Sequence, residues 1–141
     1  MYRIVYLSSA SPLYSDEALK DILTVSRRNN EQSGITGILL YHEGSILQVL
    51  EGDELKVTNC YHRILFDDRH KGAMIIMEGA CEQRYFEKWS MGFQQVNDAQ
   101  WDTVSGYFPV TSESVQFENK NKSAQDLVTF IGSFCNSSFR F

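Results

Sequence analysis

Three polar side chains stand where the pattern of the sequence calls for apolar ones. Gln48 interrupts an apolar row formed by Ile46 and Leu50, because side chains two residues apart along a strand lie on the same face. Tyr6 lies on a similarly apolar strand, and Asn30 prolongs the apolar stripe of a helix. A buried carboxamide needs hydrogen-bond partners, since leaving it unpaired costs about 1–3 kcal/mol. A phenol and two carboxamides around an aliphatic cavity would suit a flat, partly polar heterocycle.

Each of these residues also has an ordinary structural explanation. Tyr6 could be a packing tyrosine, Asn30 a residue at a helix end, and Gln48 a side chain exposed at a sheet edge. The helical stripe that leads to Asn30 runs through Leu19, Ile22, Leu23 and Ser26. These alternatives stay open until the elements that carry the residues are placed.

The segments that must position these side chains alternate in type along the chain. The sequence predicts strands over 2–8, 35–41, 45–51, 73–78 and 89–93, and helices from Ser15 or Asp16 to about Asn30 and from Asp53 to about Asp67. Ser11 and Pro12 end the first strand. This order predicts an α+β fold, a ferredoxin-like βαββαβ sheet with an added fifth strand and both helices on one face. The first and third strands are central neighbours in such a sheet, so Tyr6 and Gln48 could touch.

The chain beyond the last strand is expected to form a C-terminal helical extension over 96–141. A connector over 106–123 contains Pro109 and is rich in Ser, Asn, Glu and Lys, and a short amphipathic helix follows it. The apolar residues of that helix are Leu127, Val128, Phe130, Ile131 and Phe134. They could form a docking surface for a partner, or they could pack on the bare face of the sheet.

Composition and missing motifs exclude several classes of function. The 141 residues carry a net charge of −5 without a basic stripe, so neither nucleic acid nor an anionic membrane is an expected partner. No 18-residue apolar run is present, and GxGxxG, GxxxxGK and GxSxG are absent. The three histidines lack metal-ligand spacing, so no metal and no enzymatic turnover are expected. Three widely spaced cysteines indicate free thiols and a cytoplasmic location.

Six blocks of sequence, in one register, carry a more specific indication. They are Tyr6–Ala10, Ser26–Asn30, Gly34–Tyr41, Leu47–Gly52, Asp68–His70 and Trp89–Met91. In these blocks the chain resembles the BLUF family, the flavin-binding blue-light sensor domains. The resemblance extends from about Tyr2 to Phe93, with no departure at the chemically important positions.

The resemblance implies a flavin that lies between the two helices, with its polar edge toward the sheet. By position, Tyr6 resembles the phenol donor, Gln48 the switch amide, and Asn30 the amide that holds the pyrimidine edge. The remaining cofactor-binding residues that it implies are Ser26, Asn29, Arg63 and Asp67, with Ile22, Ile46 and Ile64 as aliphatic walls. Trp89 and Met91 share a face of the last strand, and either could approach Gln48.

The resemblance further implies a photoreceptor. The excited flavin takes an electron from Tyr6, the phenolic proton follows through Gln48, and recombination leaves the glutamine rotated or tautomerised. The expected cofactor is non-covalent FAD, with FMN as the alternative. The sequence then divides into a flavin-binding domain over 1–95 and an output segment over 96–141, which signals by direct contact to a protein partner or within a homo-oligomer. A flavin-dependent or other small-molecule enzyme on the same fold, and a ligand-binding module without a chromophore, are the rival interpretations.

Overall fold

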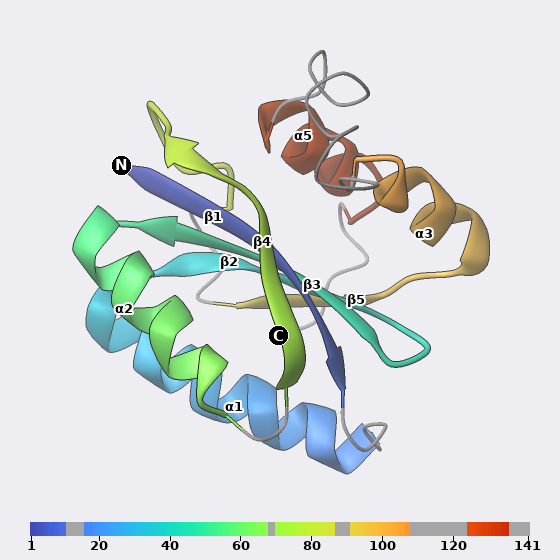
Figure 1. The fold of residues 1–141 in the computed structure, drawn as a ribbon, viewed down its shortest axis with the longest axis horizontal. Coiled ribbons are helices and arrows are strands. Elements are labelled where there is room, and N and C mark those ends of the chain that lie inside the picture. The colour runs from blue at the N-terminus through green and yellow to red at the C-terminus, as the bar shows by residue number, and fades with distance from the viewer. Residues whose placement is uncertain (11–15, 68–69, 87–90, 108–123, 136–141) are drawn as a thin grey trace.

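The computed structural model describes residues 1–10, 16–67, 70–86, 91–107 and 124–135 (Figure 1). Its elements are β1 (Tyr2–Ala10), α1 (Asp16–Ser33), β2 (Thr36–His42), β3 (Ser45–Gly52), α2 (Glu54–Leu65), β4 (His70–Ala80), β5 (Gly92–Gln95), α3 (Asp98–Ser105) and α5 (Ala124–Cys135). The predicted order of strands and helices over the first 95 residues is confirmed.

The five strands form one sheet in the order β4-β1-β3-β2-β5. All neighbours are antiparallel except β2 and β5, which run parallel. The first four strands have the ferredoxin-like order, and β5 is the added edge strand, so the predicted fold class is confirmed. β1 and β3 are central, and their register places Tyr6 directly opposite Gln48.

Local sequence features explain where these elements begin and turn. The β2–β3 hairpin turns at Glu43 and Gly44, both with positive φ, of 46° and 88°. Asp53 caps α2 as predicted, because its side chain accepts a hydrogen bond from the backbone N–H of Lys56 at 3.3 Å. Gly37 lies so close to β3 that a Cβ there would meet the Val49 carbonyl oxygen at 1.8 Å. Only glycine therefore permits this approach of β2 to β3.

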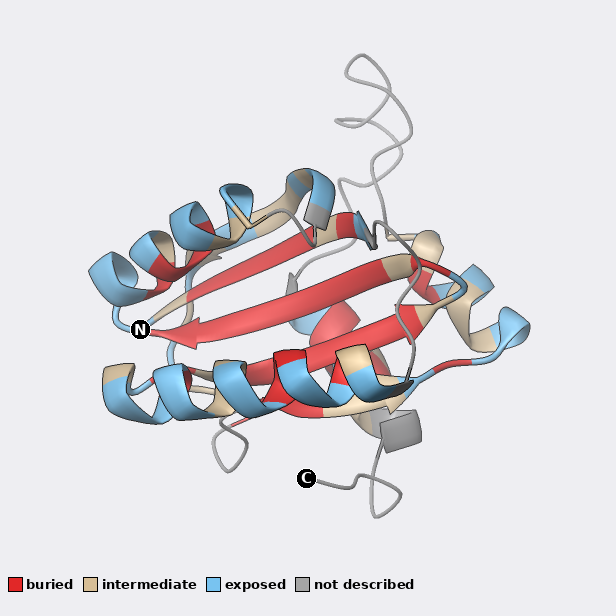
Figure 2. Ribbon diagram, turned by 90° about the horizontal axis from the view of Figure 1, so that it is seen from below, coloured by how far each residue is buried: buried red, intermediate tan, exposed pale blue. Residues whose placement is uncertain are grey.

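The sheet separates two apolar cores. α1 and α2 cover one face, as predicted, and α3 and α5 lie over the other (Figure 1). Figure 2 shows the buried sheet with the exposed outer sides of the helices around it. The core under α1 and α2 includes Ile4, Tyr6, Leu19, Ile46 and Leu50. The core under α5 includes Val5, Leu47, Val49, Leu127 and Ile131. Successive strand residues thus serve opposite cores, as the two-residue period requires.

The helix α5 packs on the sheet. Its apolar residues were expected either to form a docking surface or to cover the bare sheet face, and the structure shows the second arrangement. Leu127, Val128 and Ile131 are fully buried in the second core, and Phe130 is half-buried and stacks on Tyr107 with ring centroids 6.5 Å apart. These three buried side chains are therefore not an open docking surface. The side chain of Phe134 lies outside the described residues.

Several predicted boundaries were wrong. α1 continues to Ser33 rather than ending near Asn30, and β4 covers His70–Ala80 rather than 73–78. Among the described residues the fifth strand is Gly92–Gln95, so it excludes Met91 and ends two residues later than the predicted 89–93. A helical extension was predicted over 96–141, but no helix was located at the position of α3. The predicted break at Ser11 and Pro12, the side chain of Trp89 and most of the connector over 106–123 lie outside the described residues.

A buried ion pair joins β1 to β3 on the face that α5 covers. Arg3 and Glu51 are directly opposite in the register, and Arg3 Nε donates to Glu51 Oε2 at 2.8 Å. Glu51 is 0% exposed and also accepts the backbone N–H groups of Tyr85 and Phe86 on Oε1, at 2.9 and 2.8 Å. One carboxylate therefore fixes both the strand pair and the chain that follows β4.

We expect Glu51→Gln to lower the free energy of unfolding by about 3 kcal/mol, because it leaves the buried Arg3 guanidinium without a countercharge. The control Glu31→Gln removes an exposed carboxylate from α1 and should change stability by less than about 0.5 kcal/mol. Urea unfolding of the two variants and the parent measures both values. Equal stability of the two variants would contradict a structural role for the ion pair.

Candidate functional site

The two polar residues that the sequence singled out on the central strands do meet. Tyr6 is 0% exposed and Gln48 is 4% exposed, and the Tyr6 hydroxyl donates a hydrogen bond to Gln48 Oε1. The Tyr6 ring also contacts Tyr61 of α2 edge to face, with centroids 5.3 Å apart. Gln48 is therefore not an exposed edge residue, because the central position of β3 buries it and the phenol satisfies its carbonyl.

Met91 occupies the other side of the Gln48 amide. Gln48 Nε2 donates to Met91 Sδ at 3.1 Å, and Met91 is 1% exposed. Of the two residues that could approach Gln48, Met91 does so, and Trp89 lies outside the described residues. Tyr6, Gln48 and Met91 thus form one continuous chain of buried hydrogen bonds from β1 through β3 to the start of β5.

A cavity of about 160 Å³ opens between α1 and α2 and reaches Gln48. Its lining residues are Val25, Ser26, Asn29, Asn30, Gln48, Cys60, Arg63, Ile64 and Asp67. Seven of these were singled out from the sequence as cofactor-binding. The structure brings them together from α1, β3, α2 and the residues just after α2.

Three of the residues expected at the site do not line this cavity. Tyr6, Ile22 and Ile46 are each at most 4% exposed and belong to the buried interior. Tyr6 is linked to the cavity through Gln48. Val25 and Cys60 line the cavity although the sequence analysis did not name them. Cys60 precedes Ile64 by one helical turn, so helical spacing could have identified it.

The lining is polar at the sheet and along α1, and partly apolar along α2. Asn30 is 3% exposed, whereas its neighbour Asn29 is exposed at the surface. Burial raises the pKa of the Cys60 thiol, against a smaller opposite effect of Arg63, so the thiol stays uncharged at neutral pH. Arg63 lies in the last turn of α2 and Asp67 just after the helix, at the more exposed part of the cavity.

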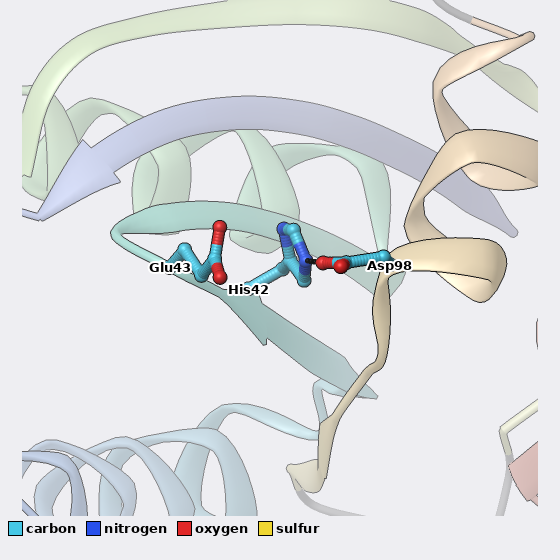
Figure 3. Close-up of side chains that lie close together, drawn as sticks. All are labelled: His42, Glu43 and Asp98. Atoms are coloured by element: carbon cyan, nitrogen blue, oxygen red, sulfur yellow. Dashed lines mark hydrogen bonds and ion pairs between the residues drawn. The ribbon is translucent and has the colours of Figure 1, made fainter.

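A second polar cluster ties α3 to the β2–β3 hairpin (Figure 3). His42 Nε2 lies 2.8 Å from Asp98 Oδ1, beside Glu43, and the His42 ring stacks on Trp101 at 5.4 Å. Among the described residues these three make the one group whose ligand atoms lie within 4.8 Å of one another. His42 is already paired with Asp98, and both carboxylates are exposed, so we interpret the cluster as a tether for α3.

Comparison with known proteins identifies the family. Residues 1–92 match the BLUF family model, described as sensors of blue-light using FAD, and this chain belongs to that family. A BLUF domain binds flavin, and the cavity between α1 and α2 contains the amide, hydroxyl and aliphatic groups that a flavin ring requires.

The most similar proteins include enzymes and sensors. The chain is 31% identical over 91 residues to photoactivated adenylate cyclase subunit alpha of Euglena gracilis, which covers 63% of this chain and 9% of that one. It is 29% identical over 125 residues to the blue light- and temperature-regulated antirepressor BluF of Escherichia coli K12, covering 86% and 31%. This chain therefore spans about a tenth of the Euglena gracilis cyclase subunits that it resembles.

Solved structures match over more of the chain. The photo-activated state of BlsA has a TM-score of 0.71 at 27% identity and covers 94% of this chain and 92% of that one. A bacterial light-regulated adenylyl cyclase has a TM-score of 0.67 at 28% identity, covering 86% and 40%. Within the described part of the chain, no helix is long and apolar enough to cross a membrane.

We expect Asn30→Ala to raise the dissociation constant for flavin by about 5- to 100-fold, because it removes a buried amide from the cavity wall. The matched control is Asn29→Ala, which removes the same group one residue away from an exposed position and should change affinity less. Titration of flavin-free protein by flavin fluorescence measures both constants. Equal affinities in the two variants would show that Asn30 does not hold the ring.

Proposed function

We propose that this protein is a blue-light photoreceptor that holds a flavin non-covalently between α1 and α2. The observation that carries the proposal is the buried chain from Tyr6 through Gln48 to Met91, which meets the cavity at Gln48. FAD is the proposed cofactor, and FMN is the alternative. The family membership supports flavin binding, and the polar side chains of the cavity support the placement of the ring.

The size and lining of the cavity define how a flavin would fit. Its volume of about 160 Å³ is below the roughly 300–1,000 Å³ of typical small-molecule sites. Binding therefore requires side chains at its more exposed end, such as Arg63, to rotate outward. Gln48 and Asn30 would then contact the polar edge of the ring. Ser26, Asn29, Arg63 and Asp67 would contact the ring and the ribityl chain, between the aliphatic walls of Ile22, Ile46 and Ile64.

When bound, the flavin supplies a strong oxidant on absorption of blue light. Tyr6 is the proposed electron donor, because a phenol is readily oxidised and becomes far more acidic when it loses an electron. Its proton passes from the hydroxyl to Gln48 Oε1, which already accepts the hydrogen bond. Return of the electron and proton regenerates the tyrosine and leaves only the Gln48 amide rearranged. The net change is therefore in hydrogen bonding, and this chain turns over no substrate.

The rearranged amide changes what Met91 contacts. In the structure Gln48 Nε2 donates to Met91 Sδ, and an amide that has rotated no longer presents that N–H to the sulfur. We propose that this loss alters the chain from Met91 onward. Residues 1–95 would then be the sensor and residues 96–141 the output segment. The output is a contact with a protein partner or within a homo-oligomer, and we propose a cytoplasmic location.

We expect Tyr6→Phe to bind flavin normally and to form no long-lived red-shifted state under blue light. The substitution keeps the ring in the buried core but removes the oxidisable phenol and its proton, so the excited flavin decays with brighter fluorescence. The comparison variant Gln48→Leu retains the donor and loses the amide, and it should also give no red-shifted state. Absorption spectra before and after illumination measure this, and a stable red shift in Tyr6→Phe would refute the role of Tyr6.

A further inference from the structure

Arg27 of α1 makes a contact that neither the sequence pattern nor the cavity explains. Its Nε donates to the backbone carbonyl oxygen of Met91 at 2.9 Å, across 64 residues of sequence. The side chain is half-buried, and desolvation lowers the pKa of its guanidinium. A cation is held in such a place only if charge-assisted hydrogen bonds offset the loss of water.

Met91 is therefore fixed at two points. Gln48 Nε2 binds its sulfur from the sheet, and Arg27 binds its carbonyl from the helix layer. Ser26, the neighbour of Arg27, lines the cavity, so the same turn of α1 borders the flavin site and holds Met91. Loss of the contact with Gln48 would leave Met91 held only through its carbonyl oxygen.

The main chain of Met91 leads directly to the output segment. Gly92 pairs with Ile38 at the start of β5, and the Val96 N–H donates to the Tyr41 carbonyl at 3.1 Å. Asn97 then caps α3, where its side chain accepts from the Gln100 N–H at 2.8 Å. The tether of His42 to Asp98 holds this end of α3 against the hairpin (Figure 3). A displacement of the Met91 main chain would therefore reach α3 through a few consecutive hydrogen-bonded residues.

We infer that Arg27 is a positioning residue that keeps Met91 Sδ within reach of the Gln48 amide, and thereby sets how fast the dark state re-forms. This inference rests on the proposed photoreceptor function. While the Gln48 amide is rearranged, Arg27 holds the Met91 carbonyl, so the sulfur is in place to accept the N–H again. Without Arg27, this contact no longer holds the Met91 main chain, so the sulfur must be repositioned before the dark arrangement re-forms, and recovery is slower.

The test compares Arg27→Ala with Arg28→Ala. Arg28 is the adjacent arginine on α1 and is exposed, so its removal changes the charge equally without touching Met91. After a blue-light pulse, Arg27→Ala should return to the dark absorption spectrum about 3- to 10-fold more slowly than the parent. Arg28→Ala should recover at the parental rate. Arg27→Lys, which keeps a charged donor, should give an intermediate rate.

Hydrogen exchange in the dark tests the tether without any photochemistry. Amides of residues 92–96 should exchange faster in flavin-loaded Arg27→Ala than in Arg28→Ala, because the start of β5 is no longer held. Equal exchange in the two variants overturns the inference, and so does an unchanged or faster recovery in Arg27→Ala. If the parent protein shows no response to light, the proposed function fails, and the exchange comparison alone then decides whether Arg27 holds β5.

Discussion

The hydrogen bond between Tyr6 and Gln48 joins the two central strands at the point where the cavity reaches the sheet. It exists only because β1 and β3 pair in one register, which sets the two residues opposite each other on the helix-covered face. A slip of one residue would turn one of the two side chains to the other face of the sheet. Arg3 and Glu51 pair on that other face, three residues along the same two strands, and a buried ion pair of this kind specifies register.

The two faces of the sheet have different tasks. The face under α1 and α2 holds the cavity and the buried polar chain, and the opposite face is closed by α5. Strand residues from Leu47 to Leu50 alternate between these faces, so Gln48 is flanked by side chains that pack under α5. We therefore propose that a change in Gln48 is transmitted through Met91 rather than through the core, because a close-packed core leaves little room for movement.

Much of this arrangement could be predicted from local sequence, and the exceptions have physical reasons. Runs of β-branched, aliphatic and aromatic residues identified the central strands, and an amide in an apolar row identified Gln48. α3 escaped prediction because it buries only Val104 among its eight residues and depends on the capping box of Asn97 and Gln100. The contact of Arg27 with Met91 joins residues 64 positions apart, and the periodicity of a sequence does not predict a contact over that separation.

The claim that light changes hydrogen bonds and leaves the flavin's oxidation state unaltered is tested most directly on the unmodified protein. Its absorption spectrum should be recorded in the dark, under blue light and again after return to darkness, in the absence of added reductant. We expect a small shift of the whole oxidised-flavin band to longer wavelength, which reverses fully in the dark. Either an unchanged spectrum or a bleached flavin band without a red shift would contradict it.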